Sequence, residues 1–242
     1  MEHEILDSKK IIETINVLNL RIAERFPGSG LSKVGGKLYK IGRETDAVIA
    51  WIEKANIWYR LGTAVFIALL LAGLIFALFS LKADLTKFTL MDAASLGEAV
   101  INEIVLLGAA VIFLVSIETR AKRKKVITAI NRLRSIAHVI DAHQLTKDPY
   151  SIARPAEDTE HSPKRTMTEY ELGRYLDYCS ELLSLTGKVG FLYVQKFDDP
   201  VSVNAVNELE ELTTGLSRKV WQKLMILETP AQKNINNRKR KN

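Results

Sequence analysis

The sequence predicts an all-α membrane protein, with two transmembrane helices that continue into a cytoplasmic helical bundle. Three observations predict this fold class. Residues 61–81 form an uncharged and mostly apolar run. Elsewhere, apolar residues recur at spacings of three and four, the period of a helix with one buried face. The chain also has no strand-like alternation and no internal repeat. The two spans take roughly 45 residues, which leaves enough of the 242-residue chain for one modest core.

Residues 1–56 are predicted to form an N-terminal cytoplasmic helical hairpin. The apolar face of its first helix consists of Ile11, Ile15, Leu18, Ile22 and Phe26. The Pro-Gly-Ser-Gly sequence that follows ends this helix. A second helical pattern runs from Leu31 to Ile52 and meets no breaker, so we expect it to continue into the first span. Gly35 and Gly36 weaken this second helix and are a candidate hinge.

Transmembrane helix 1 is placed at residues 57–81. Its apolar run, 61–81, holds twenty-one uncharged residues. As a helix these span roughly 31 Å, about the thickness of the hydrocarbon core. Trp58, Tyr59 and Arg60 come just before the run, where aromatic rings and snorkelling cations occupy the membrane interface. We therefore expect these three side chains to mark the depth of the span.

Transmembrane helix 2 is placed at residues 96–118, after a short external linker at 82–95. Its continuous apolar run, 104–117, has only fourteen residues, too few to cross a membrane. Extension back to Leu96 gives roughly 33 Å and brings in polar side chains, namely Glu98, Asn102 and Glu103. Ionisable groups at membrane depth are costly, so these are pore candidates. The other interpretation keeps Glu103 at the outer interface of a tilted or short helix.

Small side chains form a stripe along the first span. Ala64, Ala68 and Ala72 recur every four residues. Small residues at this spacing let membrane helices approach closely, either within one chain or between neighbouring chains. Two spans alone bury little of each other, so we expect a homo-oligomer.

The distribution of lysine and arginine orients the spans. On the linker side, residues 82–98 contain only two basic residues, Lys82 and Lys87. A basic cluster follows the second span and consists of Arg120, Lys122, Arg123, Lys124 and Lys125. Such clusters stay in the cytoplasm, beside anionic lipid headgroups. We therefore expect a multi-pass protein of the cytoplasmic (inner) membrane with both termini in the cytoplasm. The membrane explains this cluster without a nucleic-acid partner.

Residues 119–230 are predicted to form a cytoplasmic helical domain, followed by a basic disordered tail at 231–242. The membrane helix continues to about residue 144, and Thr166 with Glu169 forms a possible capping box for the next helix. That helix is apolar on most sides, so it should be central; its apolar residues are Leu172, Tyr175, Cys179, Leu182 and Val189. Asp199-Pro200 reads as an N-cap and first residue of the last helix.

A phosphate-binding loop and a metal site are both rejected on the sequence. A Walker A motif needs Gly-Lys-Ser/Thr, but Gly36-Lys37 is followed by Leu38. His143 falls on a different helix face from His138, so these two do not converge with Asp141 on a metal. We expect no metal and no cofactor.

Arg132 and His138 are separated by five residues. This spacing resembles the Arg-x(4–6)-His motif of HEPN ribonucleases, which are α-helical and pair two such motifs in a dimer. The resemblance covers seven residues and implies RNA cleavage by Arg132 and His138. Arg134 and His138 also share one helix face, which is the ordinary polar edge of a helix.

The preferred interpretation is a non-enzymatic, oligomeric membrane protein whose cytoplasmic helices bind a protein partner or sense a signal. If the oligomer encloses Glu103, it could conduct ions or permeabilise the membrane. Two-span effectors of bacterial defence systems offer a comparison for such a role. The comparison rests on architecture alone and is an analogy. One alternative is a passive membrane anchor or scaffold that recruits a soluble partner. The other is a membrane-tethered HEPN-like ribonuclease.

Overall fold

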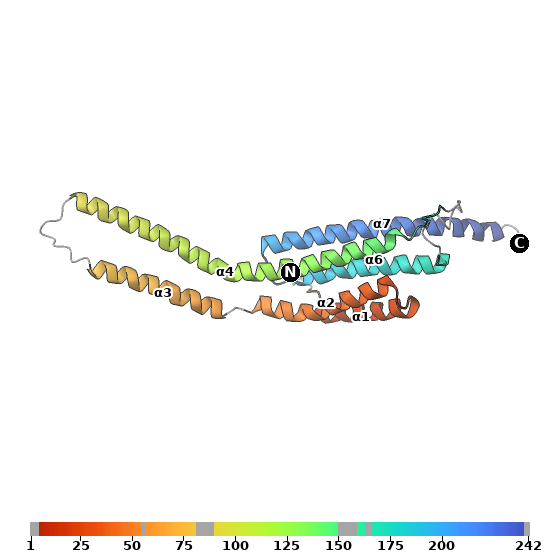
Figure 1. Cartoon of the computed structure of the whole chain (residues 1–242), viewed down its shortest axis with the longest axis horizontal. Coiled ribbons are helices and arrows are strands. Elements are labelled where there is room, and N and C mark those ends of the chain that lie inside the picture. The colour runs from red at the N-terminus through yellow and green to blue at the C-terminus, as the bar shows by residue number, and fades with distance from the viewer. Residues whose placement is uncertain (1–4, 55–56, 81–89, 150–158, 163–165, 240–242) are drawn as a thin grey trace. The chain divides into compact units, whose positions relative to one another are not determined.

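The computed structural model describes residues 5–54, 57–80, 90–149, 159–162 and 166–239. These residues form helices and no strand, so the predicted all-α fold class is confirmed for the described part of the chain (Figure 1). The helices are α1 (Ser8–Arg25), α2 (Gly30–Glu53), α3 (Ile57–Ser80), α4 (Leu90–Leu145), α6 (Glu169–Leu192) and α7 (Pro200–Lys239).

The helices divide into two units. Residues 1–53 and 125–242 form one compact unit, here called the bundle unit. Residues 54–124 form the other, here called the apolar unit. The long helix α4 contributes to both, because its residues 90–124 belong to the apolar unit and its residues 125–145 to the bundle unit. The predicted continuation of the second apolar segment to about residue 144 is therefore confirmed.

Helix α6 is the central element of the bundle unit, as its apolar sequence predicts. It packs against α1, α2 and α7. It also meets α4, since a Cβ atom added at Gly190 would lie 3.7 Å from Ile130 and 3.8 Å from Leu133. Contact with four helices explains why so many apolar positions of α6 are buried, among them Leu176, Leu182 and Val189.

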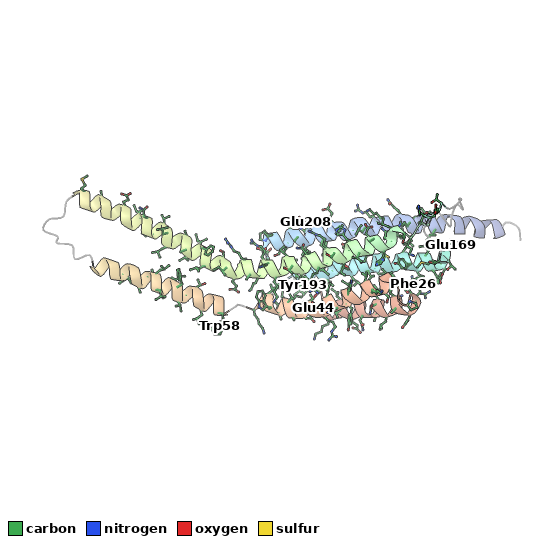
Figure 2. All side chains as sticks on the ribbon, viewed as in Figure 1. Phe26, Glu44, Trp58, Glu169, Tyr193 and Glu208 are labelled. Atoms are coloured by element: carbon green, nitrogen blue, oxygen red, sulfur yellow. The ribbon has the colours of Figure 1, made fainter. Side chains whose placement is uncertain are left out.

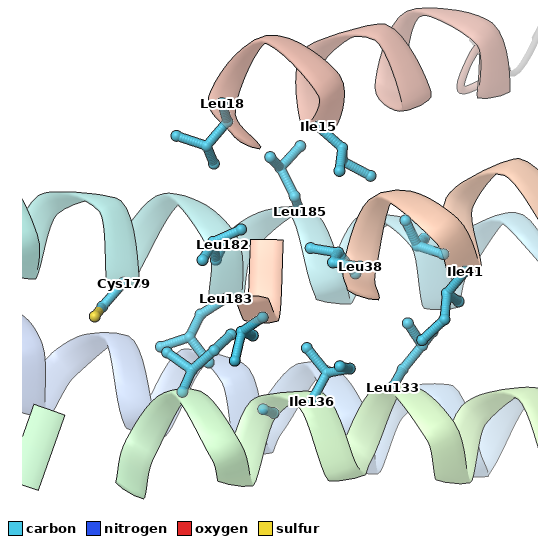
Figure 3. Packing of buried hydrophobic residues seen from close by; sticks show 14 of the residues in the cluster. Ile15, Leu18, Leu38, Ile41, Leu133, Ile136, Cys179, Leu182, Leu183 and Leu185 are labelled. Carbon is cyan, nitrogen blue, oxygen red and sulfur yellow. The ribbon is translucent and has the colours of Figure 1, made fainter. Parts of the chain in front are cut away.

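One hydrophobic core joins all five helical segments of the bundle unit (Figure 3). Ile15 comes from α1, Leu38 from α2, Leu133 from α4 and Leu182 from α6, and each of them is fully buried. Cys179 lies in the same core, as its helical spacing predicts. Residues before the first apolar segment and after the second one thus depend on each other for the burial of their apolar faces.

The turn between α1 and α2 follows its glycine-rich sequence. Gly28 has a φ of 71°, a conformation that costs glycine little. The amide of Phe26 donates to the carbonyl of Ile22 at 2.8 Å and closes α1. Gly35 is no hinge in this structure, because α2 is continuous through it. A Cβ atom there would come within 3.0 Å of Asn19 Oδ1, so this glycine permits close packing of the hairpin.

The N-terminus of α6 is capped, but not in the predicted frame. Thr168 is the N-cap, and its hydroxyl accepts the amide of Glu171 at 3.2 Å. The Glu171 carboxylate accepts the amide of Thr168 at 2.8 Å. The predicted box of Thr166 and Glu169 is wrong, since Glu169 is the first helical residue. Both frames match the Thr-x-x-Glu pattern, and only the start of the helix distinguishes them.

The start of α7 agrees with the sequence. Asp199 precedes Pro200, the first helical residue, and its carboxylate accepts the amide of Ser202 at 2.9 Å. Close to this end, Gly190 of α6 leaves room for Leu209 of α7. A Cβ atom at Gly190 would lie 2.6 Å from Leu209 Cδ2, so the glycine allows the two helices to pack closely.

Three predicted boundaries differ from the structure. Helix α2 ends at Glu53 instead of continuing into the next helix. Helix α4 begins at Leu90, within the predicted linker. Helix α7 runs to Lys239, through most of the predicted disordered tail. The predicted tail from 231 to 239 has no glycine to end the helix, and Pro230 did not stop it.

Candidate functional site

The apolar unit exposes large hydrophobic side chains along both of its helices. On α3, Leu69 is 66% exposed, and on α4, Ile112 is 73% exposed. Further exposed apolar residues of the two helices are Leu61, Val65, Phe66, Leu71, Ile75, Ile101, Ile104, Val105, Leu106 and Phe113. Contiguous apolar surface of this extent is a site for contact with lipid or with other protein chains.

Within the described residues, one helical stretch is long and apolar enough to cross a membrane, Ile104–Leu145. None of its most apolar window is buried inside the protein. In α3, the stretch Leu61–Gly73 is apolar but shorter. An 18-residue apolar window of helix without protein cover is unlike the core helix of a soluble protein, where such a surface is buried.

The stripe of small residues lies on the surface of α3. Ala64, Ala68 and Ala72 are all exposed. Their i, i+4, i+8 spacing on one continuous helix places them on one face. This face can accept a second helix at short distance.

The polar candidates of the second predicted span all belong to α4. Glu98 and Asn102 are exposed. The side chain of Glu103 lies outside the described residues. Glu98 and Asn102 are four residues apart, so they share a face of the helix, whereas Asn102 and Glu103 point about 100° apart.

Cations gather at the end of the predicted second span and interact locally. The Arg120 guanidinium lies 5.3 Å from the ring centroid of Phe113, and Lys122 pairs with Glu118 at 2.9 Å. Arg123 and Lys124 also have interaction partners. In the bundle unit, the ammonium group of Lys125 lies 4.1 Å from the ring centroid of Trp51, a cation–π contact.

The aromatic residues at the start of α3 include Trp58, which is 80% exposed (Figure 2). An exposed indole is usual at a membrane interface and uncommon on an isolated soluble helix. The side chains of Tyr59 and Arg60 lie outside the described residues.

Arg132 and His138 lie on α4, in the bundle unit, but do not face one another. Arg132 donates to the carboxylate of Glu44 on α2 at 2.8 Å. His138 is exposed. His138 is six positions after Arg132, which puts the two side chains about 120° apart around the helix. Arg134 pairs instead with Glu208 of α7 at 2.7 Å. Both arginines join α4 to neighbouring helices.

The other potential metal ligands of α4 are also directed apart. Asp141 accepts the side-chain amide of Gln144 at 2.7 Å. The His143 ring packs on Gly30, where a Cβ atom would overlap it. No group of three or more His, Cys, Asp or Glu side chains that could hold a metal occurs in the part of the chain that the structure describes.

A cluster of arginine and tyrosine side chains was missed from the sequence. Arg21 and Arg25 of α1 meet Tyr170, Arg174 and Tyr178 of α6. Each set has i, i+4 spacing, so each occupies one face of its helix. This spacing can be recognised in the sequence and shows that each set shares one face. The contact between the two faces depends on the packing of α1 against α6.

Comparison with family models, with curated proteins and with solved structures found no match to this chain.

Proposed function

We propose that the protein is an oligomeric two-span protein of the cytoplasmic membrane, whose bundle unit lies in the cytoplasm and binds a partner or senses a signal. The observation that carries the proposal is the uncovered apolar surface of α3 and of α4 before the basic cluster. In water, the exposure of that surface would be unfavourable by about 25 cal/mol per Å². A lipid bilayer removes this penalty for both helices.

The orientation rests on charge. The basic cluster from Arg120 to Lys125 follows the second span. Between the spans, the only lysine or arginine residues are Lys82 and Lys87. Anionic headgroups and the positive-inside rule favour the cluster on the cytoplasmic side. Both termini and the whole bundle unit then share that side, which agrees with their common core.

We propose that the oligomer encloses a water-filled path along α4. A carboxylate facing lipid near the membrane centre costs about 2.5–3.5 kcal/mol, and a wet interior removes most of this cost. Glu103 would line that interior together with Leu107, Ala110 and Leu114. The stripe of Ala64, Ala68 and Ala72 would then pack helix against helix.

The proposed pore is tested by Glu103→Gln in reconstituted bilayers. We expect conductance in the wild-type protein, and a lower preference for cations in the variant, because a ring of carboxylates favours cations. The mass of the detergent-purified oligomer should not change. Ala68→Leu should reduce that mass, whereas Ala109→Leu, an equal enlargement on α4, should not.

Two outcomes would remove the pore from the proposal. One is a monomeric particle, and the other is a wild-type protein without conductance. A monomer or a silent oligomer that still fractionates with membranes would favour a passive anchor that recruits a soluble partner through the bundle unit.

A further inference from the structure

The arginine and tyrosine cluster lies at the end of the bundle unit formed by the last turn of α1 and the first turns of α6. The guanidinium carbons of Arg21 and Arg174 lie 5.9 Å and 4.8 Å from the ring centroid of Tyr178. The guanidinium carbon of Arg25 lies 5.5 Å from the ring centroid of Tyr170. Three guanidinium groups thus converge on two aromatic rings.

Tyr178 is held by the rest of the bundle and gives the cluster a rigid base. The rings of Tyr178 and Phe26 have centroids 6.2 Å apart in an edge-to-face arrangement. Tyr178 itself is buried. The same end of the bundle unit carries Phe26 and Glu169, which Figure 2 labels. A site built on buried helical side chains keeps its geometry better than one built on a loop.

The guanidinium groups retain unused donors. Arg174 pairs with Asp177 at 2.8 Å. Among the described residues, no carboxylate forms an ion pair with Arg21 or Arg25. Arg25 donates a long hydrogen bond, at 3.3 Å, to the hydroxyl of Tyr170, and its guanidinium also interacts with the hydroxyl of Tyr178. Each guanidinium has five N–H donors, so most of those on Arg21 and Arg25 remain for a ligand.

The charge of the cluster acts on its central phenol. Burial by itself raises the pKa of Tyr178, but the guanidinium groups of Arg174 and Arg25 outweigh this effect and hold the pKa below its usual value. The cluster therefore stabilises negative charge at this position.

An open hollow of about 790 Å³ adjoins the cluster and is lined by Arg21, Glu24, Arg25, Tyr170, Arg174 and Tyr178. This volume is within the range of roughly 300–1,000 Å³ usual for small-molecule sites. Tyr170 is 64% exposed, so its ring is accessible to a planar group. Glu24 contributes an acceptor for an amino or hydroxyl group of the ligand.

We propose that this hollow binds a nucleotide, with its phosphate on the guanidinium groups of Arg21 and Arg25 and its base against the ring of Tyr170. Guanidinium forks match phosphate oxygens in pairs. Aromatic side chains stack on bases of any sequence. The proposal concerns only the bundle unit and requires neither the membrane spans nor the pore.

The test uses the full-length protein in detergent and calorimetric titration with four nucleoside monophosphates, one for each common base. Inorganic phosphate and the four nucleosides are the partial probes. At least one nucleotide should bind at least about tenfold more tightly than its nucleoside and than phosphate, because it engages both halves of the site. Arg25→Gln and Tyr170→Leu should each weaken that binding by about tenfold or more.

The control is Arg218→Gln, which removes an exposed arginine from α7 and should leave binding unchanged. Three results would overturn the proposal. They are no heat of binding with any nucleotide at millimolar concentration, equal weakening by Arg25→Gln and Arg218→Gln, and phosphate binding as tight as nucleotide binding. Because both Arg25 and Tyr170 have exposed side chains, their replacement should not unfold the bundle. Circular dichroism of each variant checks this point.

Discussion

Replacing Leu133 with alanine is expected to reduce the free energy of unfolding of the full-length protein by about 2–5 kcal/mol. Leu133 is fully buried on α4. It lies beside the point where Leu209 of α7 packs against Gly190 of α6. The truncation leaves a cavity among three helices that cannot collapse without moving one of them. Denaturant unfolding in mild detergent, followed by tryptophan fluorescence, measures the change.

Val139→Ala is the matched control for Leu133→Ala. Val139 is an apolar residue on the same helix, but it is 38% exposed. Its truncation should change the free energy of unfolding by less than about 1 kcal/mol. Equal effects of the two substitutions would contradict the assignment of residues 125–145 to the shared core.

Leu106→Arg should prevent insertion of the proposed second span. Leu106 lies near the centre of residues 96–118 and is 66% exposed. On insertion scales, a central arginine in place of leucine costs about 3 kcal/mol, which changes an equilibrium by more than about a hundredfold. The span at 96–118 already contains Glu98, Glu103 and Glu118, so it has little margin for a further charge.

The measurement for Leu106→Arg is a reporter fused after residue 242 that is active only in the cytoplasm. Loss of the second crossing would move the reporter to the other side of the membrane and silence it. Leu106→Ile keeps the apolar surface and should leave the reporter active. An active reporter in the arginine variant, at wild-type abundance, would show that residues 96–118 do not cross in the proposed way.

Most helices of this chain could be predicted because each has its own local pattern. The face of α1 from Ile11 to Ile22 and the Asp199-Pro200 start of α7 depend on residues close in sequence. The end of α2 at Glu53 could not be predicted, since no glycine or proline marks it. The capping frame of α6 was ambiguous because two Thr-x-x-Glu pairs overlap. The extension of α7 to Lys239 shows that one proline is a weak sign of disorder.

The candidate sites likewise divide into those that the sequence alone reveals and those that require the fold. The two apolar segments, the basic cluster and the alanine stripe are features of continuous sequence, so they could be identified without the fold. The arginine and tyrosine cluster joins residues of α1 to residues of α6 that lie about 150 positions further along the chain. Sequence shows that each set shares a face, but only tertiary packing brings the two faces together. The ion pair between Arg132 and Glu44 likewise could not be predicted, because it depends on the packing of α4 against α2.

Cysteine labelling in intact cells tests whether the chain crosses a membrane twice with the bundle unit in the cytoplasm. Cys179 is the only cysteine. Its burial raises the pKa of its thiol to about 12, so it should stay unreactive in the folded protein.

Phe88→Cys, between the spans, should react with a membrane-impermeant maleimide. Asn207→Cys, on the exposed surface of α7, should react only after the membrane is permeabilised. Labelling of Asn207→Cys in intact cells, or protection of Phe88→Cys until permeabilisation, would contradict the account.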